Sequence, residues 1–214
     1  NSLLALAALS IATTAHAGVI YVKKGATGAN NGTSWADAFA ELRDALPASA
    51  PNDELWIAQG TYTPATSNDS FVVNGRKLYG GFTGIETLLD QRNWATYPTI
   101  LSGDILGDDV GFGGADNCKH VVRLTSAPVQ LDGLIIQGGV ALGTGMDRAG
   151  AGVLADPNSG TQSTDIVNCI LRFNRARRGA AIHFDHGIMR VVGCLFDSND
   201  AVGQGGSDGC GGFY

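Results

Sequence analysis

Short apolar runs separated by Gly, Asn, Asp and Pro recur along the chain from Gly18 onward. Runs of this kind, bounded by turn residues, predict β-strands. The expected strands are VIYV (19–22), ELWIA (54–58), TYT (61–63), FVV (71–73), KLYGGF (77–82), TILSG (99–103), HVVRL (120–124) and VQLDGLIIQ (129–137). Many of these runs lack strict alternation of apolar and polar residues, which favours strands buried inside a stack.

One segment instead has the periodicity of an amphipathic helix. SWADAFAELRDAL (34–46) begins with a capping-type Ser. Its apolar face is formed by Trp35, Phe39, Leu42 and Leu46. Pro47 is expected to end this helix. Because no second amphipathic helix separates the later strands, a doubly wound α/β sheet is disfavoured.

Two short phrases repeat in the second half of the chain. The first phrase occurs as LIIQGGVA (134–141), CILRFNRA (169–176) and CLFDSNDA (194–201). The second occurs as GAGV (150–153), GAAI (179–182) and CGGF (210–213). Similar but inexact spacings of roughly 25 to 35 residues predict a solenoid, in which stacked coils share one core and the loops vary in length. Because each repeat holds short strands and no helix, the predicted coil is that of a β-helix.

Stacking predicts which residues of the repeats should meet. Equivalent positions of neighbouring coils lie about 4.8 Å apart, the spacing of adjacent strands. We expect Leu171 to lie over Phe196, with Ile136 before them, as an inward apolar ladder. Asn174 and Asn199 are expected to stack at a bend, where the amide of one can bond the copy above it.

The same stacking makes Cys169 and Cys194 neighbours, at a separation inside the range that a disulfide requires. A free cysteine packs as a small hydrophobe, and we favour stacked thiols over a bridge here. The chain contains four cysteines in all: Cys118, Cys169, Cys194 and Cys210.

Composition bounds the class of protein. Of the 214 residues, 44% are apolar, which is enough for one domain with a sizeable core. The 31 glycines indicate many tight turns or close backbone approaches. The formal net charge of −6 argues against a nucleic-acid partner, since phosphate binding requires a basic face.

The first 17 residues differ from the rest. The short apolar run LLALAALSIA (3–12) is followed by AHA (15–17), the pattern of a secretory signal with its cleavage site, and it is too short to span a bilayer. We therefore expect export, with 1–17 as a truncated signal peptide and 18–214 as the β-helix domain. The chain stops at GGFY, just after another repeat begins, so we expect the domain to be incomplete at its C-terminal end.

The repeats resemble a known family. GAAI (179–182) and FDSN (196–199) resemble the GGA[ILV] and FxxN repeats of polymorphic outer-membrane proteins, which are bacterial surface adhesins, although Ala180 replaces the second glycine. YVKKGATGANNGTSWADAFAELRDAL (21–46) and DELWIAQGTYTP (53–64) are similar to the opening of many secreted bacterial right-handed parallel β-helix proteins of the pectin-lyase-like fold. The resemblance spans nearly all of 18–214. It implies an all-β, right-handed parallel β-helix with an N-terminal capping α-helix, and it is less specific for activity.

An acidic, glycine-rich loop at 103–117 is the candidate metal site. Carboxylate oxygens in such a loop suit Ca²⁺, although the spacing does not match an EF-hand and a solvated surface loop is the alternative. The candidate ligands are Asp104, Asp108, Asp109 and Asp116.

RFNRARR (172–178) is the candidate glycan-binding segment. Clustered arginines can grip uronate carboxylates in bidentate fashion, whereas a solvated loop between coils is the simpler interpretation. The residues concerned are Arg172, Arg175, Arg177 and Arg178.

HFDHG (183–187) supplies candidates for acid–base catalysis, Asp185 and His186. Glycoside hydrolysis requires two carboxyl groups about 5 to 9.5 Å apart, and no facing pair is recognisable. We therefore expect an exported, cell-surface or secreted, adhesin-like scaffold that contacts polysaccharide or host-cell glycans. It would need no cofactor apart from Ca²⁺ and contain no transmembrane helix. The alternative is a polysaccharide lyase or glycoside hydrolase of the same fold.

Overall fold

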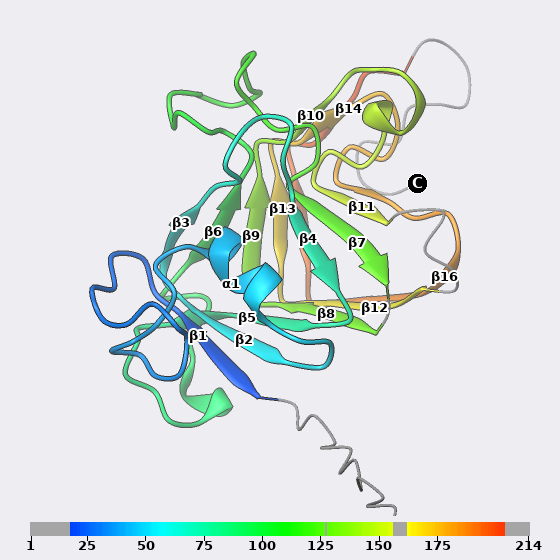
Figure 1. The fold of residues 1–214 in the computed structure, drawn as a ribbon. Coiled ribbons are helices and arrows are strands. Elements are labelled where there is room, and N and C mark those ends of the chain that lie inside the picture. Colours follow the sequence, from blue (N-terminus) through cyan, green and yellow to red (C-terminus); the bar gives the residue numbers. More distant parts are fainter. Residues whose placement is uncertain (1–17, 127, 156–161, 204–214) are drawn as a thin grey trace, which may run out of the picture.

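The computed structural model describes residues 18–126, 128–155 and 162–203, and within them the strands form four sheets in which neighbours run parallel (Figure 1). Sheet A contains β1 (Val19–Val22), β2 (Glu54–Ala58), β5 (Lys77–Phe82), β8 (Val129–Asp132), β12 (Gln162–Val167) and β16 (Gly187–Val192). Sheet B contains β3 (Gly60–Tyr62), β6 (Thr99–Ser102), β9 (Leu134–Gln137), β13 (Ile170–Arg172) and β17 (Leu195–Asp197). Sheet C contains β4 (Phe71–Asn74), β7 (Val122–Ser126), β11 (Val153–Ala155) and β15 (Ile182–His183). The small sheet D contains β10 (Val140–Ala141), β14 (Arg175–Ala176) and β18 (Asp200–Ala201).

The chain visits these sheets in a recurring order. From β2 onward, successive strands fall in sheets A, B and C, and from β10 onward sheet D is inserted between B and C. The prediction of a mostly β chain built from parallel strands is therefore confirmed. Short 3₁₀ turns, η1 (Leu89–Gln91) and η2 (Gly145–Arg148), lie in two of the connecting loops.

Inward-facing residues align in register from strand to strand. On sheet A the inward row consists of Ile20, Leu55, Leu78, Leu131, Ile166 and Val191. On sheet B, Leu171 pairs with both Ile136 and Phe196, as predicted, and the first two side chains are fully buried. The residues of these rows belong to one apolar core. Their alignment in register removes apolar surface from water, which stabilises the fold.

The strand predicted at 129–137 is interrupted. It forms β8 and β9, separated by Gly133, whose φ of +71° turns the chain from sheet A to sheet B. The chain passes through sheets A and B twice more, and in these two passages Asn168 and Gly193 occupy the same corner, also with positive φ. Only glycine adopts this conformation without strain, although asparagine tolerates it better than other residues do.

The predicted asparagine stack is confirmed. Asn174 Nδ2 donates to Asn199 Oδ1 at 3.0 Å and to the carbonyl of Ile136 at 3.1 Å. Its Oδ1 accepts the backbone N–H of Gly139 at 3.1 Å, and Asn199 Nδ2 donates to the carbonyl of Leu171 at 2.8 Å. The two amides thus connect the three passages of the repeated phrase.

The helix prediction is wrong over most of its length. The α-helix of the described chain, α1, runs over Leu42–Ala48 and contains Pro47 in its last turn. Residues 34–41 instead form turns, because Ser34 Oγ accepts the N–H of Asp37, and the Asp37 carboxylate accepts the N–H of Ala29. Phe39 pairs with Val22 as an extra β-bridge. Side chains that bond the nearby backbone compete with helix formation in this way.

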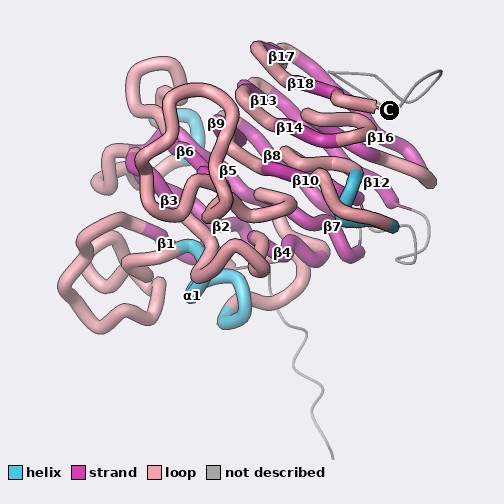
Figure 2. The backbone as a smooth tube through the Cα atoms, turned by 90° about the horizontal axis from the view of Figure 1, so that it is seen from above, coloured by secondary structure: helices cyan, strands magenta, loops and turns pink. Residues whose placement is uncertain are grey.

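The two ends of the stack of strands are distinct in Figure 2, where α1 lies near β1 and where β17 and β18 lie at the opposite end. Helix α1 contacts β1 and β4 and buries Leu42 and Ala45. Within the described residues, no helix has the length and apolar character needed to cross a bilayer. The predicted signal segment 1–17 and the repeat at 210–213, which contains Cys210, lie outside the described residues.

A second apolar cluster covers part of the outer face of sheet A. Trp56 and Tyr79 are buried there. Trp35, from the segment between β1 and β2, and Leu89, from the segment between β5 and β6, pack against them. The segment between β5 and β6 also brings Arg92 back onto this face, where its guanidinium forms an ion pair with Asp132. This segment therefore packs as a structural cover for sheet A.

Candidate functional site

The acidic loop between β6 and β7 gathers three of its four predicted ligands. Carboxylate oxygens of Asp104, Asp108 and Asp116 lie within 4.8 Å of one another. Asp109 is not part of this group, and its carboxylate accepts the backbone N–H of Gly114. Carboxylates this close repel one another unless a cation or hydrogen-bond donors neutralise them.

Backbone amides of the loop supply part of that neutralisation. Asp104 accepts the N–H groups of Gly107 at 2.7 Å and of Asp109 at 3.2 Å, and Asp116 accepts that of Leu106 at 3.1 Å. These bonds fix the shape of the loop. Asp108 is exposed at its surface. The three carboxylates are hard oxygen ligands of the type that Ca²⁺ takes, and backbone carbonyls or water would complete its shell of six to eight oxygens.

The same loop carries Phe112 onto the corner that follows sheet B. The Phe112 ring lies edge-on to Phe173, with ring centroids 6.5 Å apart and planes at 81°. The guanidinium carbon of Arg172 lies 5.8 Å from the centroid of Phe173, and that of Arg175 lies 5.9 Å from the centroid of Phe112. We call these four residues, Phe112, Arg172, Phe173 and Arg175, the corner site.

Neighbouring strands hold the two arginines in place. Arg172 Nε donates to Gln137 Oε1 at 2.8 Å, and these residues are in register on β13 and β9. Arg175 Nε lies 3.1 Å from Asp200 Oδ2, its register partner on β18. Both contacts involve Nε, the guanidinium nitrogen nearest the aliphatic part of the side chain. They therefore fix the orientation of the two guanidinium groups. Phe112 is 42% exposed, which leaves aromatic surface at the corner accessible to a ligand.

The backbone at the corner is unusual. Phe173 has a φ of +52°, a conformation that is uncommon for any residue with a large side chain. Gly138 and Ser198 occupy the equivalent corner positions and also have positive φ. The positive φ at this corner is therefore common to the three repeats. Of the three residues that adopt it, Phe173 is the one with an aromatic side chain.

The other two predicted arginines directly follow β14 and lie beside η2. Arg177 Nε donates to the carbonyl of Leu142 at 2.9 Å. The backbone N–H groups of Arg177 and Arg178 both donate to the carbonyl of Arg148, at the end of η2. The structure thus divides the predicted cluster into a pair at the corner site and a pair beside η2.

Asp185 pairs with a histidine that the sequence interpretation missed. Its Oδ1 lies 3.1 Å from Nε2 of His183, whereas His186 lies on the exposed turn. Burial lowers the pKa of His183, and the nearby Asp185 carboxylate opposes that shift. The missed signal is the period of two in an extended chain, which places residues i and i+2 on the same side.

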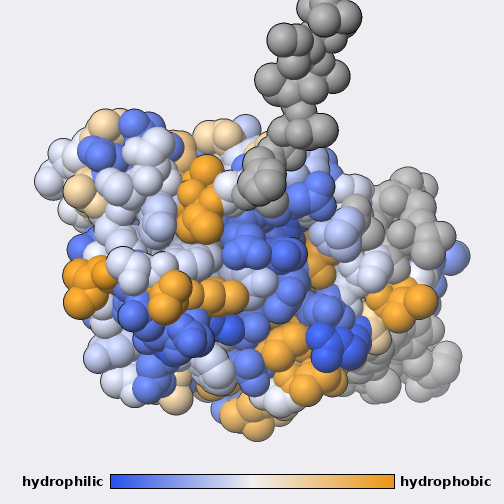
Figure 3. All heavy atoms as spheres, turned by 90° about the horizontal axis from the view of Figure 1, so that it is seen from below, coloured by the Kyte–Doolittle hydropathy of each residue, from blue (hydrophilic) through white to orange (hydrophobic). Residues whose placement is uncertain are grey.

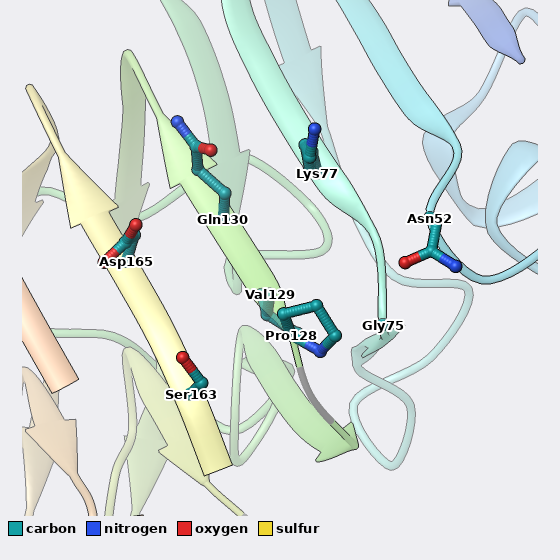
Figure 4. A pocket seen from close by; sticks show the side chains of 8 residues that line it. All are labelled: Asn52, Gly75, Lys77, Pro128, Val129, Gln130, Ser163 and Asp165. Carbon is teal, nitrogen blue, oxygen red and sulfur yellow. The ribbon is translucent and has the colours of Figure 1, made fainter. Parts of the chain in front are cut away.

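A polar pocket of about 190 Å³ lies on the outer face of sheet A (Figure 4). Lys77, Gln130 and Asp165 project into view from three neighbouring strands in register. In Figure 3, which views the molecule from this side, hydrophilic residues form a band between separate apolar groups. Lys77 pairs with Glu54 and Asp165 with Arg190, so the charges of this surface are matched within it.

No protein-family model, no curated protein and no solved structure matches the chain.

Proposed function

We propose that the four sheets are the faces of one right-handed parallel β-helix, capped at its first coil by α1. The recurring order of sheets A, B and C and the continuous inward rows support this arrangement. Right-handedness follows the strong preference of parallel crossover connections. In this arrangement each passage through the sheets is one coil, and the corner site lies where the coil turns from sheet B to sheet D.

We further propose that the protein is an exported, adhesin-like scaffold, displayed on the cell surface or secreted, that contacts glycans carrying carboxylate groups. One observation carries the proposal: Arg172 and Arg175 each lie against one ring of an aromatic pair at an accessible corner. Aromatic faces support the apolar side of a sugar ring, and planar guanidinium forks bind carboxylates in two parallel hydrogen bonds. Export is inferred from the sequence of 1–17.

The glycan proposal predicts a loss of binding in the double variant Arg172→Ala/Arg175→Ala. Hydrogen bonds to charged groups contribute about 1.5 to 3 kcal/mol, so affinity for an oligogalacturonate should fall at least tenfold. Isothermal titration calorimetry with the intact chain measures this. The matched control is Arg43→Ala/Arg190→Ala, which removes the same charge from exposed positions away from the corner.

Equal weakening in both double variants would mean that net charge alone attracts the ligand and would refute the corner site. Unchanged binding in the corner variant would refute it as well. Appearance of new reducing ends or of unsaturated sugars during the titration would favour the alternative, a lyase or hydrolase.

We also propose that the acidic loop binds one Ca²⁺ through Asp104, Asp108 and Asp116. Because this loop carries Phe112, bound calcium should hold the ring at the corner site. Calcium titration followed by calorimetry should give a one-site isotherm, which Asp104→Asn/Asp116→Asn abolishes. Asp109→Asn is the matched control and should retain binding, since Asp109 lies outside the group of three. Absence of heat at millimolar calcium would contradict the proposal.

A further inference from the structure

Cys169 and Cys194 occupy matching positions on neighbouring passages of the chain. Each directly precedes a strand of sheet B, β13 or β17, and these two strands lie side by side (Figure 2). They pair in register from Ile170 and Leu195 onward. Residues in such register are about 4.8 Å apart between Cα atoms, within the range that a disulfide spans. Both residues are free thiols, in agreement with the prediction of stacked thiols.

The two thiols differ in their surroundings. Cys169 is fully buried, and its Sγ lies 3.2 Å from the carbonyl of Val167. Cys194 is half-buried, and its Sγ accepts the backbone N–H of Cys169 at 3.4 Å. A backbone N–H directed at a sulfur stabilises the thiolate, which is the nucleophilic form. The geometry therefore makes Cys194 the more accessible and the more easily ionised member of the pair.

The electrostatics agree with this assignment. Hydrogen bonding from the Cys169 thiol lowers the pKa of Cys194 to about 7, although partial burial and the Asp132 carboxylate oppose the shift. Burial raises the pKa of Cys169. Cys118, at a different place in the core, has its pKa raised to about 12 by burial. The chain thus contains an unreactive buried thiol that serves as an internal control.

We propose that Cys169 and Cys194 form a reactive dithiol site, at which Cys194 attacks small disulfides and Cys169 closes a bond between neighbouring passages of the chain. This inference does not rest on the proposed glycan contact. It assigns the pair a redox chemistry, with low-molecular-weight disulfides as the class of reactant.

The reaction proceeds in two exchanges. The Cys194 thiolate attacks one sulfur of the small disulfide, whose S–S bond breaks and releases one small thiolate. The Cys169 thiol then transfers its proton to solvent and attacks Sγ of the mixed disulfide, which releases the second small thiolate. The protein loses two electrons and two protons, and the small disulfide is reduced to two thiols. The resulting bond closes a loop between positions 25 residues apart, and such closure stabilises a fold by restricting its unfolded chain.

The test uses the reduced 214-residue chain with Cys210→Ser, so that the three described thiols are the ones that remain. Treatment with 5,5′-dithiobis(2-nitrobenzoate) should release two equivalents of thionitrobenzoate in one fast phase. Mass spectrometry should then find a protein lighter by two hydrogens, with no adduct and with Cys169 linked to Cys194. The melting temperature should rise by several degrees, and a reductant should reverse the rise.

Single variants in that background separate the roles. Cys194→Ser should slow thionitrobenzoate release at least tenfold, Cys169→Ser should release one equivalent and keep a stable adduct on Cys194, and Cys118→Ser should leave the fast phase unchanged. A stable adduct on the parent chain, or no release before denaturation, would overturn the proposal. Mass mapping of the disulfide is done on the Cys210→Ser chain, which keeps both Cys169 and Cys194. It therefore tests the proposal even where a further serine variant fails to fold.

Discussion

Replacing Asn174 with alanine is expected to destabilise the protein by about 4 kcal/mol. The side chain is fully buried and bonds groups of the two neighbouring passages of the chain. Its removal would leave the N–H of Gly139, the carbonyl of Ile136 and the amide oxygen of Asn199 each without this partner. Each buried polar group that loses its partner costs about 1 to 3 kcal/mol.

Urea denaturation of both proteins, followed by circular dichroism, measures the difference. Asn199→Ala is the matched control, because Asn199 is half-buried at the next position of the same stack and should cost about half as much. Asn174→Asp should be nearly as damaging as the alanine, since a carboxylate cannot donate to the carbonyl of Ile136. A loss below about 1 kcal/mol for Asn174→Ala would show that the stack contributes little.

Replacing Arg92 with alanine is expected to cost about 3 to 5 kcal/mol, as removal of one member of a buried ion pair does. Nη2 of Arg92 lies 2.8 Å from Oδ2 of Asp132, and the two side chains are 8% and 9% exposed. The guanidinium carbon also lies 5.2 Å from the Tyr79 ring centroid and 4.9 Å from that of Trp94. Without Arg92, the charge of Asp132 would remain buried with Asn168 Nδ2 as a neutral donor.

The exposed pair Arg190–Asp165 provides the matched control. Arg190 bonds both carboxylate oxygens of Asp165, at 2.9 and 3.0 Å, but its side chain is 58% exposed. Arg190→Ala should therefore leave the unfolding midpoint nearly unchanged, because solvent and salt screen such pairs. The double variant Arg92→Met/Asp132→Leu should be less destabilised than Arg92→Ala, since it buries no uncompensated charge. Equal midpoints for Arg92→Ala and Arg190→Ala would contradict the expectation.

Contacts between repeats could be predicted because they depend on register alone. Once CILRFNRA (169–176) is aligned with CLFDSNDA (194–201), the pairings of Leu171 with Phe196 and of Asn174 with Asn199 follow from parallel stacking. The helix could not be placed in the same way. The apolar residues have helical spacing from residue 34 onward. Hydrogen bonds from backbone N–H groups to the side chains of Ser34 and Asp37 nevertheless favour turns in the first half of the segment.

By itself, the sequence determined the repeat, the mostly β architecture, the parallel pairing and the inward rows, because each follows from periodic apolar residues and turn signals. Only the tertiary structure decided which polar residues meet. The four arginines of 172–178 divide between the corner site and the segment beside η2, because the turn at Phe173 and the two residues of β14 carry the chain from one place to the other. Phe112 joins two of them from a loop that lies two passages earlier in the chain. Such contacts depend on the paths of the loops. The loops do not repeat from one passage to the next, so the stacking of the repeats does not predict them.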